Sequence, residues 1–346
     1  MIELLKKLTA TPSFSGDEAD TARIIYDYLL ERGVKPSRYL NNVTATSSNY
    51  RVDKPTLLLN SHHDTVRPSS GYTRNPFEPS EEDGRLYGLG SNDAGASTVA
   101  LISVFCKLYD KDLPYNIVLA ITGEEESIGK NGIAALWPEL PSIDFAIVGE
   151  PTGMNPARAE RGLIVLDCLA EGVSGHAARN EGVNAIYKAL DDIEIIRNLK
   201  FDRVSDLSGE VKLTVTQINA GIGHNVIPSE CGFVVDIRPN DLYDNKEIVE
   251  TIKRKVNCKV TPRSLHLRAS GVPADHILMK TAESLGMESY VSPTTSDISR
   301  INVPALKLGP GDSARSHTAD EYVYIDEVVQ GEKIYTEFLN RLSEFI

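Results

Sequence analysis

Four short apolar runs constrain the fold of this chain more than any other feature. They lie at 56–59, 116–121, 145–148 and 305–308, and segments with helical patterns alternate with them. A strand that is apolar on both faces needs a packing layer on each side, which is typical of a parallel sheet covered by helices. The runs therefore predict an α/β fold with a mostly parallel sheet. Apolar residues on one stripe before Gly33 also predict a helix at the start of the chain.

The middle of the chain follows a different order of predicted elements. Strands are expected at 162–170, 211–218, 231–237 and within 259–267, and helices at 182–199 and 245–256. The order βαββαβ is that of a compact motif that can fold by itself. We therefore predict a catalytic domain in two parts, with a ferredoxin-like domain inserted between them. The expected boundaries are 1–160, 161–268 and 269–346, and a length of 346 residues suits two domains.

Composition excludes several classes of function. Lys and Arg number 36 against 49 Asp and Glu, so the net charge is −13. An acidic chain without basic clusters is a poor partner for phosphate backbones or anionic lipid, so we expect neither a nucleic-acid nor a membrane partner. The first residues are polar where a signal peptide has its apolar core, and no run reaches the ~18 apolar residues of a spanning helix. Scattered cysteines without CxxC spacing predict free thiols and a cytoplasmic protein.

Side chains that can bind metal or move protons follow each of the four predicted strands. The first strand leads to His62, His63 and Asp64, the second to Glu124, Glu125 and Glu126, the third to Glu150, and the fourth, through a Gly-Pro-Gly loop, to His317. Ligands of open parallel sheets bind beyond the carboxyl ends of the strands, so we expect these side chains in one crevice. Asp93, which ends a Gly-rich loop before a predicted helix, is a further candidate.

Each of these residues, taken alone, has an ordinary structural explanation. A histidine at a strand end usually satisfies hydrogen bonds, Asp93 could cap a helix, and three consecutive glutamates could form a solvated turn. Together, however, the carboxylates would repel one another unless cations neutralise them. Two divalent ions that share a carboxylate would do so, and would form a hydrolytic site that polarises a carbonyl and activates water. Imidazole and carboxylate ligands without thiolate favour zinc, with cobalt or manganese as substitutes.

Five motifs that carry these residues occur in order along the chain. They are His62-His63-Asp64, the Gly-rich segment 88–93 that ends at Asp93, Glu124-Glu125, Gly149-Glu150-Pro151-Thr152, and the late segment 316–321 that contains His317. The set resembles the aminoacylase family that contains acetylornithine deacetylase and succinyl-diaminopimelate desuccinylase, with related zinc carboxypeptidases. The resemblance covers nearly the whole chain. It implies a zinc-peptidase-like catalytic domain and an inserted dimerisation domain.

The resemblance also implies a role for each residue of the crevice. Asp93 would bridge two zinc ions, with His62 and Glu150 completing one shell and Glu125 and His317 the other. Asp64 would support His62 from behind. Glu124 would be the general base that takes a proton from water and gives it to the leaving amine. Glu126 has no role in this scheme and is expected at the surface.

In the inserted domain, the resemblance implies a homodimer in which each subunit completes the site of its partner. His176, in Gly175-His176-Ala177-Ala178-Arg179, would stabilise the oxyanion of the tetrahedral intermediate. Asn225 and Arg238 match substrate-binding positions. The Arg238 guanidinium suits the α-carboxylate of the substrate, and an ion pair at a strand end is its alternative role.

The expected activity is metal-dependent hydrolysis of the amide bond of an N²-acyl-L-ornithine, which releases ornithine for arginine biosynthesis. Segments 292–297 and 309–315 resemble a subgroup that acts on N-acylated ornithine or lysine. A succinyl group would need a further cation, for which Arg179, Arg300 and Arg315 are candidates, so acetyl and succinyl both stay open.

Two departures from the family pattern leave the expected ligands in place. Asp93 is followed by Ala94-Gly95-Ala96 instead of Met-Lys-Gly, and Leu89 replaces an arginine. These departures affect the choice of substrate and not the expected hydrolytic reaction. The alternatives are a di- or tripeptidase or metallo-carboxypeptidase of the same family, or a deacylase of acyl-lysine, acyl-citrulline or succinyl-diaminopimelate. A phosphoesterase and a non-catalytic binding protein are the alternatives from other classes.

Overall fold

The computed structural model describes residues 1–179 and 181–346, which form two compact units. The first unit comprises Met1–Arg158, Val272–Tyr290 and Ser296–Ile346, and the second comprises Ala159–Gly271 and Val291–Thr295. The insert predicted at 161–268 falls within the second unit. The short return of 291–295 to that unit has no counterpart in the prediction.

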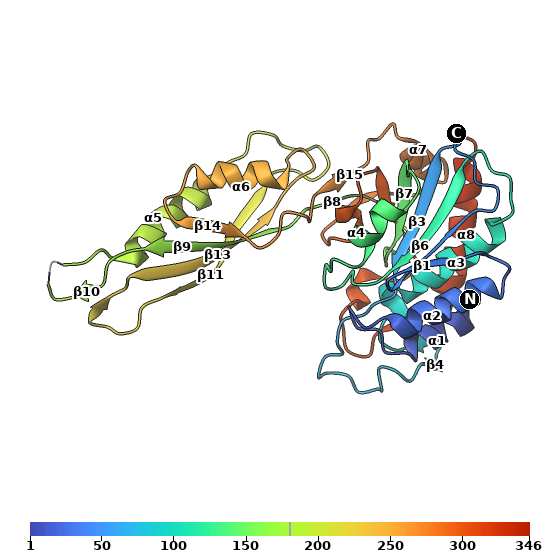
Figure 1. The fold of residues 1–346 in the computed structure, drawn as a ribbon, viewed down its shortest axis with the longest axis horizontal. Helices are drawn as coiled ribbons and strands as arrows, with labels where there is room; N and C mark the ends of the chain where they lie inside the picture. Colours follow the sequence, from blue (N-terminus) through green and yellow to red (C-terminus); the bar gives the residue numbers. More distant parts are fainter. Residues whose placement is uncertain (180) are drawn as a thin grey trace. The chain divides into compact units, whose positions relative to one another are not determined.

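A mainly parallel sheet forms the centre of the first unit (Figure 1). Its parallel neighbours, in order, are β6 (Asn116–Thr122), β3 (Thr56–His62), β7 (Phe145–Gly149) and β17 (Ala305–Lys307). Antiparallel strands extend both edges: β2 (Asn42–Thr46) and β1 (Ser37–Tyr39) lie beyond β6, and the start of β8 (Ala157–Glu160) pairs with β17. The end of β8 belongs to the second unit and pairs there with β15 (Ser270–Gly271). The predicted α/β class is therefore confirmed.

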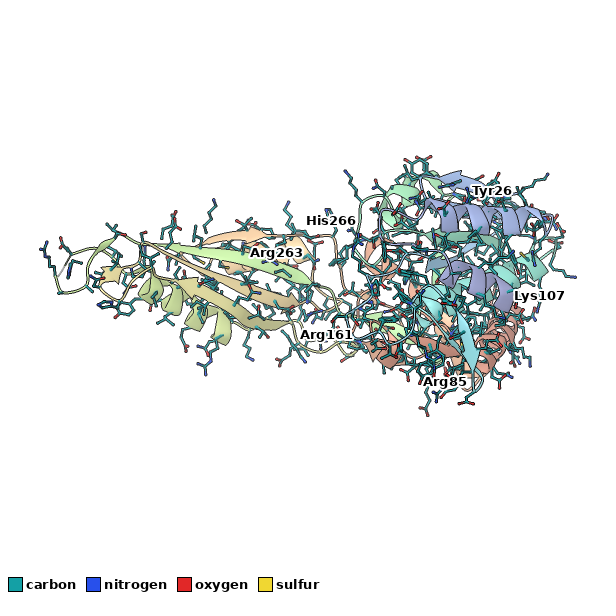
Figure 2. The ribbon with its side chains drawn as sticks, turned by 90° about the horizontal axis from the view of Figure 1, so that it is seen from below. Tyr26, Arg85, Lys107, Arg161, Arg263 and His266 are labelled. Atoms are coloured by element: carbon teal, nitrogen blue, oxygen red, sulfur yellow. The ribbon has the colours of Figure 1, made fainter. Side chains whose placement is uncertain are left out.

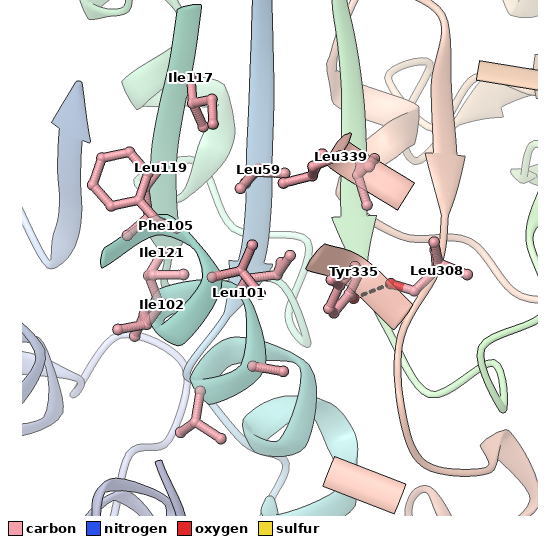
Figure 3. Packing of buried hydrophobic residues seen from close by; sticks show 14 of the residues in the cluster. Leu59, Leu101, Ile102, Phe105, Ile117, Leu119, Ile121, Leu308, Tyr335 and Leu339 are labelled. Atoms are coloured by element: carbon pink, nitrogen blue, oxygen red, sulfur yellow. Dashed lines mark hydrogen bonds between the residues drawn. The ribbon is translucent and has the colours of Figure 1, made fainter. Parts of the chain in front are cut away.

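Both faces of this sheet are buried, which explains the unbroken apolar runs. Leu57 and Leu59 point to the face covered by α3 (Ala96–Leu108) and α8 (Ile325–Leu342), whereas Leu58 points to the opposite face with α4 (Ile133–Leu136). Figure 3 shows Leu101 and Phe105 of α3 packed beside the sheet. In the same view, the Tyr335 hydroxyl of α8 donates a hydrogen bond to the Leu308 carbonyl.

The start of the chain forms two helices instead of the single predicted one. These are α1 (Ile2–Thr9) and α2 (Ala19–Leu30). The break between them contains Pro12, which cannot donate a helical hydrogen bond, and Gly16, whose φ of 91° lies in the left-handed region.

Several shorter elements complete the first unit. They are α7 (Ile277–Ser284), the small sheet of β4 (Ser80–Glu82), β5 (Arg85–Tyr87) and β18 (Tyr322–Tyr324), and single helical turns at Ser91–Gly95, Trp137–Glu139, Asp297–Arg300 and Ser313–Arg315. β16 (Tyr290–Ser292) begins in this unit and ends in the second. In the described residues, no helix combines the length and the apolarity needed to span a membrane.

The second unit has the order βαββαβ expected from the sequence pattern. Its antiparallel sheet runs β11 (Lys212–Ala220), β13 (Glu230–Arg238), β9 (Ile164–Glu171) and β14 (Lys259–Pro262). Apolar side chains of β9 and β13 pack under α5 (Ala185–Asn198) and α6 (Asn245–Lys253). The other face is only partly buried, and there Arg263, labelled in Figure 2, pairs with Asp167 at 2.8 Å. The short pair β10 (Gly175–His176) and β12 (Val226–Ile227) lies apart from this sheet.

We predict that Leu101→Ala lowers the free energy of unfolding by about 2–5 kcal/mol, because it leaves a cavity in the fully buried layer between α3 and the sheet. Leu30→Ala is the matched control, since Leu30 is 49% exposed, and it should change stability by less than ~0.5 kcal/mol. Urea denaturation followed by circular dichroism measures both. Equal losses in the two variants would contradict the assignment of the core.

Candidate metal centre

Imidazoles and carboxylates at the carboxyl end of the parallel sheet gather into two groups. In the described residues, the first group is His62, Asp93 and Glu150, and the second is Asp93, Glu126 and His317. One possible ligand atom from each member lies within 4.8 Å of the others in its group. His62 ends β3 and Glu150 follows β7, so the parallel sheet itself brings these two residues together.

Asp93 belongs to both groups and points one carboxylate oxygen toward each. Its Oδ1 lies 3.3 Å from Nε2 of His62, and its Oδ2 lies 3.7 Å from Nε2 of His317. Nε2 of His62 is 3.8 Å from Oε1 of Glu150, and Nε2 of His317 is 2.9 Å from Oε2 of Glu126. This is the arrangement expected of a carboxylate that bridges two ions.

Asp64 holds His62 in the orientation that a metal ligand needs. Nδ1 of His62 lies 3.0 Å from the backbone carbonyl oxygen of Asp64 and 3.4 Å from the carboxylate Oδ1 of the same residue. A proton on Nδ1 would leave the lone pair of Nε2 directed at Asp93 and Glu150. Burial lowers the pKa of His62, but the Asp64 and Asp93 carboxylates outweigh it and leave this pKa well above its ordinary value.

The charge balance of the crevice fits divalent cations. Burial and the nearby Glu150, Asp297 and Glu126 carboxylates raise the pKa of Glu125 well above its ordinary value. Burial raises the pKa of Asp297 to about 6. The hydrogen bond with Glu126 raises the pKa of His317 to about 9. Cations would relieve the repulsion behind the carboxylate shifts, and oxygen and imidazole donors without thiolate suit Zn²⁺.

The side chains of the acidic triplet lie differently from the sequence-based expectation. Glu126, expected at the surface, has a side chain only 8% exposed and contacts His317, whereas Glu125 is in neither ligand group. Glu124 is turned away: its carboxylate accepts hydrogen bonds from the backbone N–H of Asn131 at 3.0 Å and from its Nδ2 at 2.6 Å. The cause is a left-handed turn at Glu124, with φ of 57°, which shifts the pattern by one residue.

Two carboxylates hold this turn by its backbone. Asp64 accepts hydrogen bonds from the N–H groups of Glu125 and Glu126, both at 3.1 Å. Glu18, which is buried, accepts one from the N–H of Glu124 at 3.1 Å and one from Nδ2 of Asn41 at 2.8 Å. These contacts direct the Glu125 and Glu126 side chains toward the two groups.

The remaining expected site residues lie in the second unit. The β10–β12 pairing brings His176 beside Asn225, whose carbonyl accepts a hydrogen bond from Ala177 at 3.0 Å. Arg238 forms a bidentate ion pair with Asp236, at 2.8 and 3.1 Å, which is the alternative role considered for it. The catalytic role of His176 and the substrate-binding roles of Asn225 and Arg238 stay predictions.

Three buried carboxylates near the groups have no role in the sequence-based scheme. Glu18 contacts the acidic turn, Asp297 accepts a hydrogen bond from the Thr122 hydroxyl at 2.8 Å, and Glu321 contacts the loop that carries Asp93. Burial raises the pKa of Glu321 to about 8. The sequence carries only weak signals for two of these carboxylates. Asp297 ends the segment 292–297 and Glu321 ends the segment 316–321, and both segments resemble the family. Nothing in the sequence marks Glu18.

Comparisons with known proteins agree with this geometry. The profile of Peptidase family M20/M25/M40 matches residues 58–341. The chain is 30% identical to an acetylornithine deacetylase of Proteus mirabilis over 93% of this chain and 91% of the relative. It is 28% identical to another, from Pectobacterium carotovorum, over 93% and 92%.

Solved structures show the same fold. An aminopeptidase PepT from Bacillus cereus has a TM-score of 0.80 at 20% identity and covers 99% of this chain and 98% of its own. A tripeptidase from Staphylococcus aureus has a TM-score of 0.76 at 22% identity, with coverage of 99% and 98%. A dinuclear metal-binding peptidase of the M20 family from Bacillus subtilis has a TM-score of 0.75 at 15% identity, with coverage of 100% and 98%. The family match spans most of the chain and includes every residue of the two ligand groups, so the chain belongs to the M20/M25/M40 peptidase family.

Proposed function

We propose that this hydrolase is a two-metal N-acyl-amino-acid deacylase that cleaves the amide bond of an N²-acyl-L-ornithine. The observation that carries the chemistry is the placement of Asp93 between two groups of ligands. The deacetylase relatives, matched over more than nine tenths of both chains, support the substrate class. Ornithine release in arginine biosynthesis and a cytoplasmic location belong to the same proposal, and the free cysteines are consistent with the latter.

In this proposal, His62, Asp93 and Glu150 would hold one ion, and Asp93, Glu126 and His317 the other. Zinc is the favoured metal, with cobalt or manganese as substitutes. Such ions would supply Lewis acidity, which polarises the substrate carbonyl and makes water easier to deprotonate.

Glu125 is the proposed general base in place of Glu124. Its carboxylate lies near enough to Glu150 and Glu126 for their charges to act on it, whereas the Glu124 carboxylate is held by Asn131. One oxygen of Glu125 would accept a proton from the attacking water and later deliver it to the nitrogen of the leaving amine. Asp64 would keep that oxygen in place by holding the N–H groups of Glu125 and Glu126.

The relatives favour acetyl over succinyl as the acyl group, because both are acetylornithine deacetylases. Arg300 donates to the Ile128 carbonyl at 2.8 Å and would have to exchange this partner for the second carboxylate of a succinyl group. Arg315 uses one nitrogen, Nη2, for both oxygens of Glu327, at 2.8 and 2.9 Å, and its Nε and Nη1 have no hydrogen-bond partner among the described residues, so Arg315 stays a candidate. Arg179, in the second unit, is weakly paired with Glu181 at 3.6 Å and stays a candidate.

A peptidase that cleaves di- or tripeptides is the second candidate. The aminopeptidase and the tripeptidase share the fold over nearly the whole chain, which favours this reading. Both candidates use the same metal groups and the same base, and they differ only in the substrate that the crevice accepts.

A homodimer through the second unit is part of the proposal. The edge strand β11 and the helix α5 expose large apolar side chains, with Ile218 53% exposed and Tyr187 67% exposed. Exposed apolar groups of this size commonly mark protein interfaces. Pairing of this unit would also let His176 serve the site of the partner as an oxyanion donor.

For the substrate, we predict that the zinc- or cobalt-loaded protein hydrolyses N²-acetyl-L-ornithine at least ~100-fold faster, in kcat/KM, than N²-succinyl-L-ornithine. Such a ratio corresponds to about 2.7 kcal/mol of transition-state binding. Release of the free α-amine measures it, with a panel of di- and tripeptides in parallel. A preference for peptides would put the second candidate first.

For the base, we predict that Glu125→Gln lowers kcat by about 10²–10⁴-fold while two ions still bind, because only proton transfer is lost. Glu126→Gln should weaken binding of one ion. Glu124→Gln is the matched control, since its oxygen can accept from the Asn131 N–H while its NH₂ donates to Oδ1 of a flipped Asn131 amide, and it should keep activity within ~10-fold. Turnover that survives Glu125→Gln and disappears in Glu124→Gln would restore the sequence-based assignment.

For the dimer, we predict that sedimentation gives twice the 37.9 kDa chain mass, and that Ile218→Lys with Tyr187→Glu gives a monomer that has lost most activity. Leu30→Glu, an exposed position in the first unit, is the control and should leave the dimer intact. A fully active wild-type monomer would contradict both the pairing and the proposed role of His176.

A further inference from the structure

A distant residue, Glu321, binds the backbone of the loop that carries Asp93 at several points. Its carboxylate accepts hydrogen bonds from the backbone N–H of Gly90 at 3.1 Å and from those of Asn92 and Asp93 at 2.9 Å each. The Glu321 carbonyl accepts a fourth from the N–H of Gly88 at 2.9 Å. Glu321 is 2% exposed, so water does not compete for these donors.

The loop needs such support because its one helical turn, Ser91–Gly95, is interrupted at Asp93, whose φ of −113° and ψ of 102° are not helical. Gly88 and Gly90 have φ of 146° and 75°, which suits glycine and little else. A Cβ on Gly90 would lie 2.5 Å from Cγ2 of Thr65, so the turn is also sterically confined. Because this turn is irregular, the N–H groups of Gly90, Asn92 and Asp93 bind the Glu321 carboxylate instead of carbonyls of the turn itself.

Glu321 and His317 lie four residues apart on the same connection, which leads into β18. This segment therefore contacts Asp93 twice: His317 approaches its carboxylate Oδ2 at 3.7 Å, and Glu321 binds its backbone N–H at 2.9 Å. The pairing of β18 with β5, Tyr322 opposite Tyr87, anchors the segment beside the loop. Side chain and backbone of Asp93 are thus aligned by one stretch of chain.

We propose that Glu321 is a positioning residue that fixes Asp93 between the two ligand groups, and that it acts on metal binding rather than on the substrate. This inference rests on the two-metal site proposed above. A carboxylate can accept from donors at both oxygens. A glutamine would turn an NH₂ group toward backbone N–H donors at one of them, so Glu321→Gln should displace the loop.

The test compares Zn²⁺ and Co²⁺ binding by wild type and Glu321→Gln in calorimetric titrations. Because Asp93 belongs to both groups, the affinity for both ions should fall, by about 10- to 100-fold each. The visible spectrum of the Co²⁺-loaded variant should change, because its band positions report ligand geometry. KM for the substrate at saturating metal should stay near the wild-type value.

Two control variants separate positioning from general loss of structure. Glu332→Gln changes another buried carboxylate of the first unit, which contacts Lys107 and Ser103, and should leave metal affinity unchanged. Asp320→Asn changes the neighbouring carboxylate, which accepts from the N–H groups of Thr73 and Arg74 in a different loop, and should also leave it unchanged.

Wild-type affinities and an unchanged Co²⁺ spectrum in Glu321→Gln would overturn the inference. If that variant does not fold, Glu321→Asp serves instead: it keeps the charge but is one methylene too short to reach the three N–H groups, so the same loss is expected. Wild-type stoichiometry tests the proposed function separately. A wild type that binds only one ion would contradict the two-metal site. The inference about Glu321 would then still require that Glu321→Gln lowers the affinity for that one ion. A wild type that binds neither metal would overturn both.

Discussion

The crowding of buried carboxylates at one edge of the sheet is the constraint on which the rest of this site depends. Carboxylates placed this close repel one another, and each must find donors or cations. Some are satisfied by the protein: Asp64, Glu18 and Glu321 accept backbone N–H groups. Other carboxylates, such as those of Asp93 and Glu126, lie beside imidazoles and beside one another. The carboxylates that accept backbone N–H groups stabilise the loops of the site, whereas those beside the imidazoles are the candidates for metal binding.

Much of this arrangement could be predicted from the sequence because it follows from topology. Buried parallel strands read as apolar runs, and their carboxyl ends must meet, so His62 and Glu150 could be placed together from two short segments. By contrast, the directions in which the side chains of Glu124, Glu125 and Glu126 point could not be predicted. Beyond the end of β6 the alternation of a strand no longer applies, and the left-handed turn at Glu124 decides which glutamate faces His317.

Residues that act through backbone N–H groups of distant segments are harder to predict. Glu18 and Glu124 are 106 positions apart, and Glu321 and Asp93 are 228 apart. A backbone donor is the same whatever residue carries it, so the partner leaves no mark in the sequence. The break between α1 and α2 is equally hard to interpret. Pro12 and Gly16 can be recognised in the sequence as helix breakers, but the sequence does not show that the broken segment brings the Ser15 hydroxyl to the Asp64 carboxylate, 2.7 Å away.

Asp64 contacts both a proposed metal ligand and the turn that carries the proposed base, although these two parts of the site have different proposed roles. The same carboxylate that orients His62 also holds the backbone of Glu125 and Glu126. A proposed ligand of one ion, a proposed ligand of the other and the proposed base therefore share a single support. Substitutions among these residues should be energetically non-additive, because each one changes a hub that the others also use.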